Sequence, residues 1–406
     1  MMIQIRGGVT AAKGFTASGI HVGIRKNKEK KDLALVWSEK PCSAAAVYTT
    51  NQVKGQPLLV TMEHLADGQA QAIIVNSGNA NTCTGEAGIV AARRMAVLVA
   101  EHLSIPATDV VVASTGVIGQ QLDVSVIEAG MDQLVAGLSK TGNIDAREAI
   151  MTTDTVKKEV AVQFEIGEHT VTIGAMAKGS GMIHPNMATM LSFITTDCAI
   201  SPAMLQKAIS ASVTKTYNRV SVDGDTSTND MVVVLANGMA GNAFIETEGI
   251  DYRSFYEGLN WLNTQLARMI ARDGEGATKL IECTVESAAD ETKAEELAKG
   301  VICSSLVKTA IFGADANWGR ILCALGYTRK DFDPNKVDIA FESASGYIEV
   351  CKNGIPLPFS EEKAKKILSY QEVTIYVTMN EGDAQATAWG CDLTYEYVRI
   401  NGDYRT

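Results

Sequence analysis

The residues most able to do chemistry stand together in one run, KGSGMIHPNMATML, at positions 178–191. Residues 179–181 are small and flexible, and Pro185-Asn186 is a turn signal. A strand-like run, MLSFITTD, begins just after Thr189. The pattern predicts that a loop delivers Thr189 to the start of a buried strand, where its hydroxyl could act as a nucleophile.

A threonine hydroxyl needs a base to take its proton. The free α-amino group of the same residue can do so, because its pKa is roughly 7.7–8. In mid-chain that amine exists only if the Ala188–Thr189 bond is cut first. Attack of the Thr189 Oγ on the Ala188 carbonyl would make the cut and give an ester that water hydrolyses, and the small Ala188 leaves room for the strained turn. On the residues alone, an ordinary strand-start threonine is the competing interpretation.

Acyl transfer also needs hydrogen-bond donors aimed at the developing oxyanion, each worth roughly 3–4 kcal/mol. The Thr115 hydroxyl and the Gly116 N–H could supply two, since both follow the strand-like run DVVVAS and glycine permits a close approach. A simple glycine turn after a strand is the alternative.

Lys178 and Glu275 carry opposite charges, and both stand beside glycines, as residues of loops that line a cleft often do. A cation would attract the α-carboxylate of an amino-acid substrate, and an anion would attract its ammonium group. Solvated surface charges are the alternative for both residues.

Two neighbouring features are interpreted as structural. The segment SVDGDTSTND, at 221–230, crowds three aspartates but lacks the closing glutamate of an EF-hand, so we expect an Asx-turn segment near the active site. We expect His184 to stabilise a turn or the core rather than to act as a base. No metal site is predicted, because the five histidines show no ligand-pair spacing.

The composition is that of an ordinary globular protein, with 46% hydrophobic and 20% charged residues in 406. A net charge of −11 without a clustered basic face argues against nucleic acid as a partner. The N-terminus lacks a secretory apolar run, and no stretch approaches the roughly 20 apolar residues that span a bilayer, so no membrane role is expected. Eight scattered cysteines without a C-x-x-C pair predict free thiols and a cytoplasmic location.

Apolar runs rich in β-branched residues alternate with helical patterns for most of the length. Strands are predicted at 33–38, 70–76, 109–113, 160–166, 170–177, 191–196, 220–222, 231–236, 277–285, 337–342, 347–352, 373–379 and 384–397. Helices are predicted at 87–102, 124–138, 202–217, 252–272, from 291 and at 318–326. Gly167-Glu168 is expected to form a hairpin turn. We predict an α/β (α+β) fold with a larger domain over 1–276 and a smaller α/β domain over 277–406.

The run at 178–191 resembles the cleavage motif of the ornithine acetyltransferase family, the glutamate N-acetyltransferases of arginine biosynthesis. Other segments similar to this family extend from end to end: VNSGNAN (75–81), ASTGVIG (113–119), IMTTDT (150–155), SVDGDTSTND (221–230), RDGEGATK (272–279) and INGDYRT (400–406). The resemblance implies a sandwich of mixed sheets flanked by helices, similar to N-terminal-nucleophile enzymes but distinct from them.

The resemblance also implies roles for individual residues. Thr189 would be the nucleophile of cleavage and of acetyl transfer, giving chains 1–188 and 189–406. Thr115 and Gly116 would form the oxyanion hole. Substrate would be bound by a set of six residues: Thr152 (with Thr153 as the adjacent ambiguity), Lys178, Thr189, Glu275, Asn401 and Thr406. The C-terminal tail would thus return to the active site.

By the same resemblance the chain is an acetyltransferase with a ping-pong mechanism, in the cytoplasm. It would move acetyl from N2-acetyl-L-ornithine to L-glutamate through acetyl-threonine, and two chains of each kind would form a heterotetramer. No cofactor is expected. Some relatives accept acetyl-CoA as donor, and no motif decides this for the present chain. Two alternatives remain open, an N-terminal-nucleophile aminopeptidase or amidase that passes the acyl group to water, and a non-catalytic small-molecule-binding protein.

Overall fold

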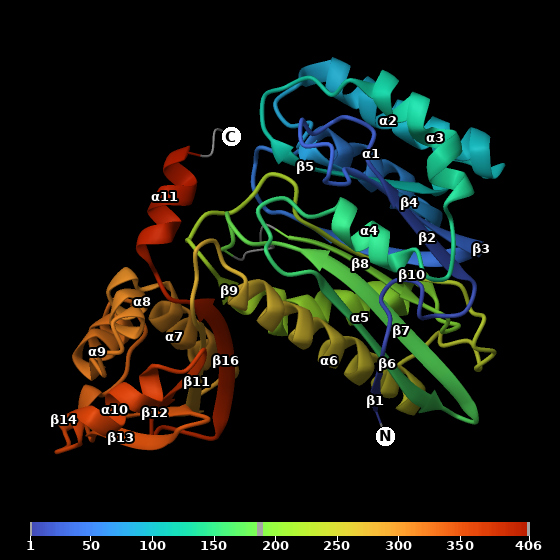
Figure 1. Cartoon of the computed structure of the whole chain (residues 1–406). Coiled ribbons are helices and arrows are strands. Elements are labelled where there is room, and N and C mark those ends of the chain that lie inside the picture. Colours follow the sequence, from blue (N-terminus) through green and yellow to red (C-terminus); the bar gives the residue numbers. More distant parts are fainter. Residues whose placement is uncertain (1, 185–189, 404–406) are drawn as a thin grey trace.

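The computed structural model describes residues 2–184 and 190–403. Within this part of the chain, the strands form one nine-stranded and one seven-stranded sheet, each covered by helices (Figure 1). Short 3-10 helices lie at Leu65–Asp67, Ala107–Asp109, Tyr217–Arg219 and Pro334–Lys336.

The nine-stranded sheet has the order β1-β6-β7-β8-β10-β3-β4-β5, and β2 also pairs with β3. Its strands are β1 (Ile3–Ile5), β2 (Phe15–Ile20), β3 (Leu33–Tyr48), β4 (Gln69–Asn79), β5 (Val110–Val117), β6 (Lys158–Ile166), β7 (His169–Lys178), β8 (Leu191–Thr196) and β10 (Met231–Ala236). The long β3 divides the sheet, because its first half pairs with β2 and its second half with β10. The β8–β10 and β4–β5 pairs are parallel and the others antiparallel.

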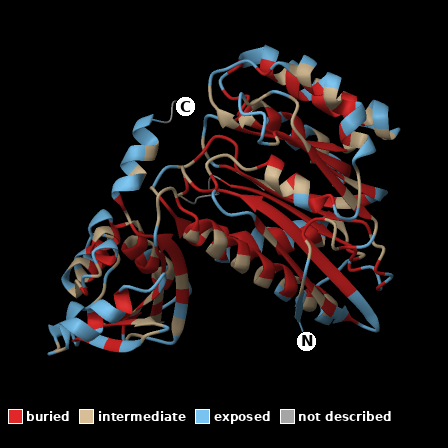
Figure 2. Cartoon of the chain, in the orientation of Figure 1, coloured by how far each residue is buried: buried red, intermediate tan, exposed pale blue. Residues whose placement is uncertain are grey.

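The two halves of this sheet enclose one apolar cluster, in which Val36 and Ile73 from one half share a core with Phe193 and Val233 from the other. Helices α2 (Gly85–Leu103) and α3 (Val124–Ala136) cover one outer face, and α5 (Pro202–Lys215) and α6 (Ile250–Arg272) cover the opposite one. Helix α1 (Gln56–His64) packs on α2, and α4 (Asn143–Ala149) packs on β2. Figure 2 shows the strands buried and the outward faces of the helices exposed. The predicted helix-flanked sandwich of mixed sheets is confirmed.

The second sheet has the order β14-β13-β12-β15-β11-β16-β9. Its strands are β9 (Val220–Ser221), β11 (Leu280–Ala288), β12 (Asp338–Ser343), β13 (Gly346–Lys352), β14 (Ile355–Pro356), β15 (Glu372–Thr378) and β16 (Ala384–Cys391). The helices beside it are α7 (Glu291–Cys303), α8 (Ser305–Phe312), α9 (Trp318–Gly326) and α10 (Glu361–Leu368). Because β9 pairs with β16, a strand from before residue 276 is part of this smaller sheet.

The prediction of one strand over residues 384–397 is wrong. β16 ends at Cys391, and helix α11 (Tyr395–Asp403) follows. Asp392 accepts hydrogen bonds from the N–H groups of Thr278 and Lys279, and Thr394 donates to the Gly276 carbonyl and accepts from the Glu396 N–H. These side chains turn the chain out of the sheet although its aromatic and β-branched residues favour a strand. As a result, α11 leaves the smaller sheet and extends away from it beyond α8 (Figure 1).

Candidate active site

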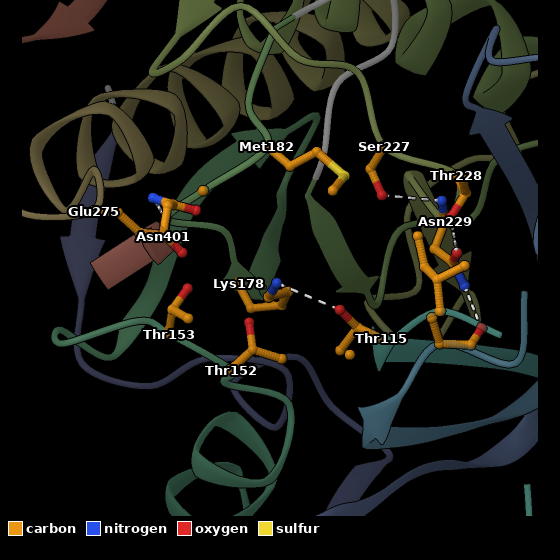
Figure 3. A pocket seen from close by; sticks show the side chains of 14 residues that line it. Thr115, Thr152, Thr153, Lys178, Met182, Ser227, Thr228, Asn229, Glu275 and Asn401 are labelled. Atoms are coloured by element: carbon orange, nitrogen blue, oxygen red, sulfur yellow. Dashed lines mark hydrogen bonds between the residues drawn. The ribbon is translucent and has the colours of Figure 1, made fainter. Parts of the chain in front are cut away.

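A pocket lies where β5 and β7 end and where α11 approaches them (Figure 3). It encloses about 610 Å³, part of it open to solvent. Its lining comes from segments far apart in the sequence: Ala80, Thr115, Gly116, Ile118, Thr152, Thr153, Lys178, Gly181, Met182, Ser227, Thr228, Asn229, Glu275 and Asn401. The fold therefore gathers into one place residues that the sequence singled out separately.

Thr115 and Gly116 form the end of β5. Gly116 has a φ of 135°, which residues with a side chain rarely adopt, and a Cβ there would collide with the backbone of Gly78 and Asn79. Thr115 is almost fully buried. A glycine is thus needed to bring this part of β5 so close to β4, and both Thr115 and Gly116 line the pocket.

Lys178 is the last residue of β7, and its side chain is buried. Its Nζ lies 3.4 Å from the Thr115 Oγ1, so the two side chains meet inside the pocket. Burial lowers the pKa of Lys178, and the nearby Asp154 carboxylate opposes part of that shift. The pocket thus contains a buried amino group, which in its charged form suits the binding of a carboxylate.

A buried ion cluster supports this lysine. Asp154 accepts hydrogen bonds from the Gly179 N–H at 2.7 Å and from the Lys158 Nζ at 2.8 Å. Lys158 also bonds to Asp273, at 2.5 Å. Burial alone would raise the pKa of Asp154, but the charges of Lys158 and Lys178 hold it below its ordinary value. The cluster keeps Asp154 ionised and fixes the backbone directly after Lys178.

Glu275 and Asn401 lie on the other side of the pocket from Thr115 (Figure 3). The Asn401 Nδ2 donates to the Glu275 Oε2 at 2.8 Å, which ties α11 to the loop after α6. The Glu275 N–H donates to the Ser180 carbonyl, and a Cβ on Gly181 would collide with the Glu275 carboxylate. The carboxylate is partly exposed at the pocket, where an ammonium group could reach it.

A family model described as the ArgJ family matches residues 16–406. The chain belongs to the ArgJ family. It is 52% identical over 400 residues to the arginine biosynthesis bifunctional protein ArgJ of Caldanaerobacter subterraneus subsp. tengcongensis, covering 98% of this chain and 99% of the relative. The ArgJ protein of Symbiobacterium thermophilum is 52% identical over 406 residues, which is 100% of both chains.

A crystal structure of the arginine biosynthesis bifunctional protein ArgJ from Bacillus halodurans is also similar, with 51% identity and a TM-score of 0.51. The match covers 100% of that solved chain but 53% of this one. Membership of the ArgJ family confirms the predicted resemblance, and with it the prediction that the chain is an acetyltransferase enzyme.

Of the predicted site residues, the structure brings a described set into one pocket: Thr115, Gly116, Thr152, Thr153, Lys178, Glu275 and Asn401. The Thr152 N–H donates to Asp154, which orients the loop that carries both threonines. Ala188, Thr189 and Thr406 lie outside the described residues. Their predicted roles therefore stay predictions.

Several residues that shape the ArgJ pocket were not singled out from the sequence. Asp154 lies in the TTDT run next to Thr152, and Asp273 stands two residues before Glu275, so proximity to the motifs was the available signal. Asn229 lines the pocket, accepts a hydrogen bond from the Thr82 hydroxyl at 2.6 Å and donates to the carbonyls of Ala80 and Ser114. The segment at 221–230 thus does lie at the site, as expected.

Three further observations concern metal binding, membrane spanning and the role of His184. Within residues 2–184 and 190–403, no group of three His, Cys, Asp or Glu side chains could hold a metal ion. Among the helices of the same residues, none is both long and apolar enough to cross a bilayer. His184 bonds through its Nδ1 to the Ser221 hydroxyl at 3.1 Å, which fits the turn-stabilising role expected for it.

Proposed function

We propose that this ArgJ protein cleaves itself between Ala188 and Thr189, and that Thr189 then carries the acetyl group during transfer. The observation that supports this most is the convergence of Thr115, Gly116 and Lys178 beside the start of β8. Leu191, two residues after Thr189, is the Cα partner of Lys178 across the β7–β8 pair. A residue close in the chain to the proposed nucleophile is thus anchored beside the pocket that holds the proposed oxyanion donors.

The proposed chemistry has two stages. In the first, the Thr189 Oγ attacks the Ala188 carbonyl, the C–N bond breaks, and water hydrolyses the resulting ester, which leaves Thr189 with a free amine. In the second, that amine takes the proton of the Thr189 hydroxyl as it attacks the acetyl carbonyl of the donor. The acetyl C–N bond then breaks and the donor's amine leaves with the proton. The acceptor amine next attacks the acetyl ester, which frees the Thr189 hydroxyl. The Thr115 hydroxyl and the Gly116 N–H would stabilise the oxyanion in this stage, because both residues line the pocket.

The charges of the pocket support an amino-acid substrate. Lys178 would bind the α-carboxylate, and Glu275, oriented by Asn401, would bind an ammonium group. Thr152 and Thr153 would contact the substrate from the loop between α4 and β6, and Thr406 would do so from the C-terminal tail. We propose N2-acetyl-L-ornithine as donor and L-glutamate as acceptor, because the curated relatives are arginine biosynthesis bifunctional proteins.

Finer features of the proposal follow the same family membership. Acetyl-CoA is proposed as a second donor, in keeping with the bifunctional naming of the relatives. Cleavage would turn one ArgJ protein into two chains of about half its length. The solved ArgJ chain is consistent with this, because all of it is matched by about half of this chain. We propose that two copies of each cleaved chain assemble into a heterotetramer in the cytoplasm and that no cofactor takes part.

The denatured mass of the purified protein tests the proposal, before and after incubation with N2-acetyl-L-ornithine. We expect two fragments that join at Ala188/Thr189, with the second gaining one acetyl group. Thr189→Ala should stay whole and unacetylated. If glutamate does not discharge the acetyl group but water does, the enzyme is an amidase. An intact wild-type chain that takes up no acetyl group would contradict both the cleavage and the nucleophile.

A further inference from the structure

The segment SVDGDTSTND, residues 221–230, contacts the chain just before the proposed cleavage site. The Asp223 carboxylate accepts hydrogen bonds from two successive N–H groups, those of Met182 at 2.6 Å and Ile183 at 2.8 Å. The Val222 N–H donates to the Ile183 carbonyl at 2.7 Å, and the Thr226 hydroxyl donates to the His184 carbonyl at 2.8 Å. The Asp223 N–H also donates to the Ile183 carbonyl at 3.4 Å, and the His184 side chain bonds to the Ser221 hydroxyl, so six hydrogen bonds from this segment hold residues 182–184.

The end of the same segment is joined to the chain just after the cleavage site. Met231, the residue that follows the segment, donates its N–H to the Met190 carbonyl at 3.1 Å. From there β10 runs parallel to β8, with Met231 paired with Leu191. Residues on both sides of positions 185–189 are therefore attached to one continuous stretch of about ten residues.

The upstream contact supports a backbone conformation that costs free energy. Met182 has a φ of 58°, in the left-handed region that costs free energy for any residue with a side chain. Its own N–H is one of the two bound by the Asp223 carboxylate, and hydrogen bonds to a charged group are about twice as strong as neutral ones. Asp223 therefore stabilises the strained turn that begins the run toward Ala188 and Thr189.

Self-cleavage depends on such restraint. In the proposed step the Thr189 Oγ–carbonyl carbon bond forms, the Ala188–Thr189 C–N bond breaks, and the hydroxyl proton ends on the departing nitrogen. An intramolecular attack of this kind is accelerated when the flanking chain is held so that the reacting atoms are near each other. We infer that Asp223 is a positioning residue for self-cleavage, acting through residues 182–184, and that segment 221–230 serves as a clamp across the cleavage site. This inference rests on the proposed function.

The time course of cleavage in freshly synthesised full-length chain tests the inference, with the fraction of intact chain read from denatured mass. Asp223→Asn keeps the size of the side chain but removes the charge and one of the two acceptor oxygens. We expect cleavage to slow about ten- to hundredfold, the effect of losing one charge-assisted hydrogen bond. Asp225→Asn is the matched control, because Asp225 carries the same charge two residues away and is exposed. It should cleave within about twofold of wild type.

A second control separates positioning from general stability. Val350→Ala removes buried methyl groups from β13 in the smaller sheet, so it should lower the melting temperature without slowing cleavage. If Asp223→Asn proves unable to fold, Thr226→Val replaces it. Loss of the hydroxyl bond to His184 should slow cleavage about three- to tenfold, whereas Thr226→Ser should not.

The outcomes are distinct. Slow cleavage in Asp223→Asn, with normal cleavage in Asp225→Asn and Val350→Ala, supports the clamp. Cleavage of Asp223→Asn at the rate of Asp225→Asn would overturn it, as would equal slowing in Val350→Ala, since the effect would then be one of stability. If wild type and both control variants all stay intact, the proposed function has failed, and the clamp fails with it.

Discussion

The Nζ of Lys178 lies 3.4 Å from the Oγ1 of Thr115, although 63 positions separate them in the chain. Lys178 is the last residue of β7 and Thr115 lies near the end of β5, on opposite halves of the nine-stranded sheet. The contact places a buried cation beside a hydroxyl that faces the pocket. It brings the proposed carboxylate-binding group next to the proposed oxyanion hole. Because the two groups belong to different side chains, replacing one side chain at a time tests the two functions separately.

Thr115→Val is the first such test. The variant keeps the shape of the side chain but loses the hydroxyl, so one of the two oxyanion donors disappears. We expect kcat for acetyl transfer to fall about 10²- to 10³-fold, the usual effect of removing one such donor. Thr115→Ser retains the hydroxyl and should keep most of the activity. A Thr115→Val enzyme within fivefold of wild type would remove Thr115 from the oxyanion hole.

Substrate affinity should depend on the contact between Glu275 and Asn401. Asn401→Ala removes the 2.8 Å hydrogen bond that orients the Glu275 carboxylate, and Glu275→Gln removes the charge itself. We expect KM for the acetyl donor to rise several-fold in the first variant and at least tenfold in the second, because a charged hydrogen bond is worth more than a neutral one. Steady-state kinetics on cleaved protein measures both. If Glu275→Gln leaves every substrate's KM unchanged, the carboxylate binds no ammonium group.

Sequence reasoning placed many elements well, because their patterns are long and locally consistent. The ranges predicted for β8, β10 and α9 match the structure residue for residue, and the hairpin at Gly167-Glu168 joins β6 to β7 as expected. The pattern failed at the C-terminus, where Tyr395 to Tyr397 favour a strand locally. There the Thr394 hydroxyl donates to the Gly276 carbonyl, more than a hundred positions away, a contact that the local pattern does not show.

The residues of the candidate site also divide into those that the local sequence suggests and those whose role depends on the fold. Thr115, Lys178 and Glu275 could be proposed from charge, hydroxyl chemistry and neighbouring glycines, but their meeting in one pocket depends on how β5 and β7 lie in the sheet. Asn401 followed only from the family resemblance, because nothing local marks an asparagine in a tail as a ligand. Asp154 was not predicted, because its role in supporting Lys178 comes from a buried ion cluster with Lys158 that no spacing rule describes.

Substrate binding should also depend on pH through Lys178. Burial lowers the pKa of this lysine, so its charge is lost at a lower pH than the ordinary value of about 10.4. Only the charged form attracts a carboxylate, so kcat/KM for the acetyl donor should decline as the pH rises toward that value. If Lys178→Arg remains active, its kcat/KM should decline only at a higher pH, because an arginine stays protonated above pH 12. Identical alkaline limbs in the two enzymes would show that another group titrates.

The last prediction concerns Asp230, which ends segment 221–230 and is buried. Among the described residues, neither oxygen of its carboxylate has a hydrogen-bond partner of good geometry, although the Met190 N–H and the Thr49 hydroxyl are close. Burial raises the pKa of Asp230 well above its ordinary value, and the charge of Lys178 offsets only part of that shift. A folded-state pKa above the unfolded value of about 3.9 means that this group's favourable contribution to folding is complete below that value and is lost as the pH rises.

Asp230→Asn should therefore stabilise the protein, and more so at higher pH, because the amide has no ionisation to suppress. We expect the melting temperature to rise by about 2 °C or more at pH 8 and by less at pH 5. Both chains are compared in the Thr189→Ala background, so that each is measured uncleaved. A gain that is equal at the two pH values would mean that Asp230 does not titrate in the folded protein. A loss at pH 8 that is absent at pH 5 would mean that the ionised carboxylate has a stabilising partner, which would reverse the sign of its contribution.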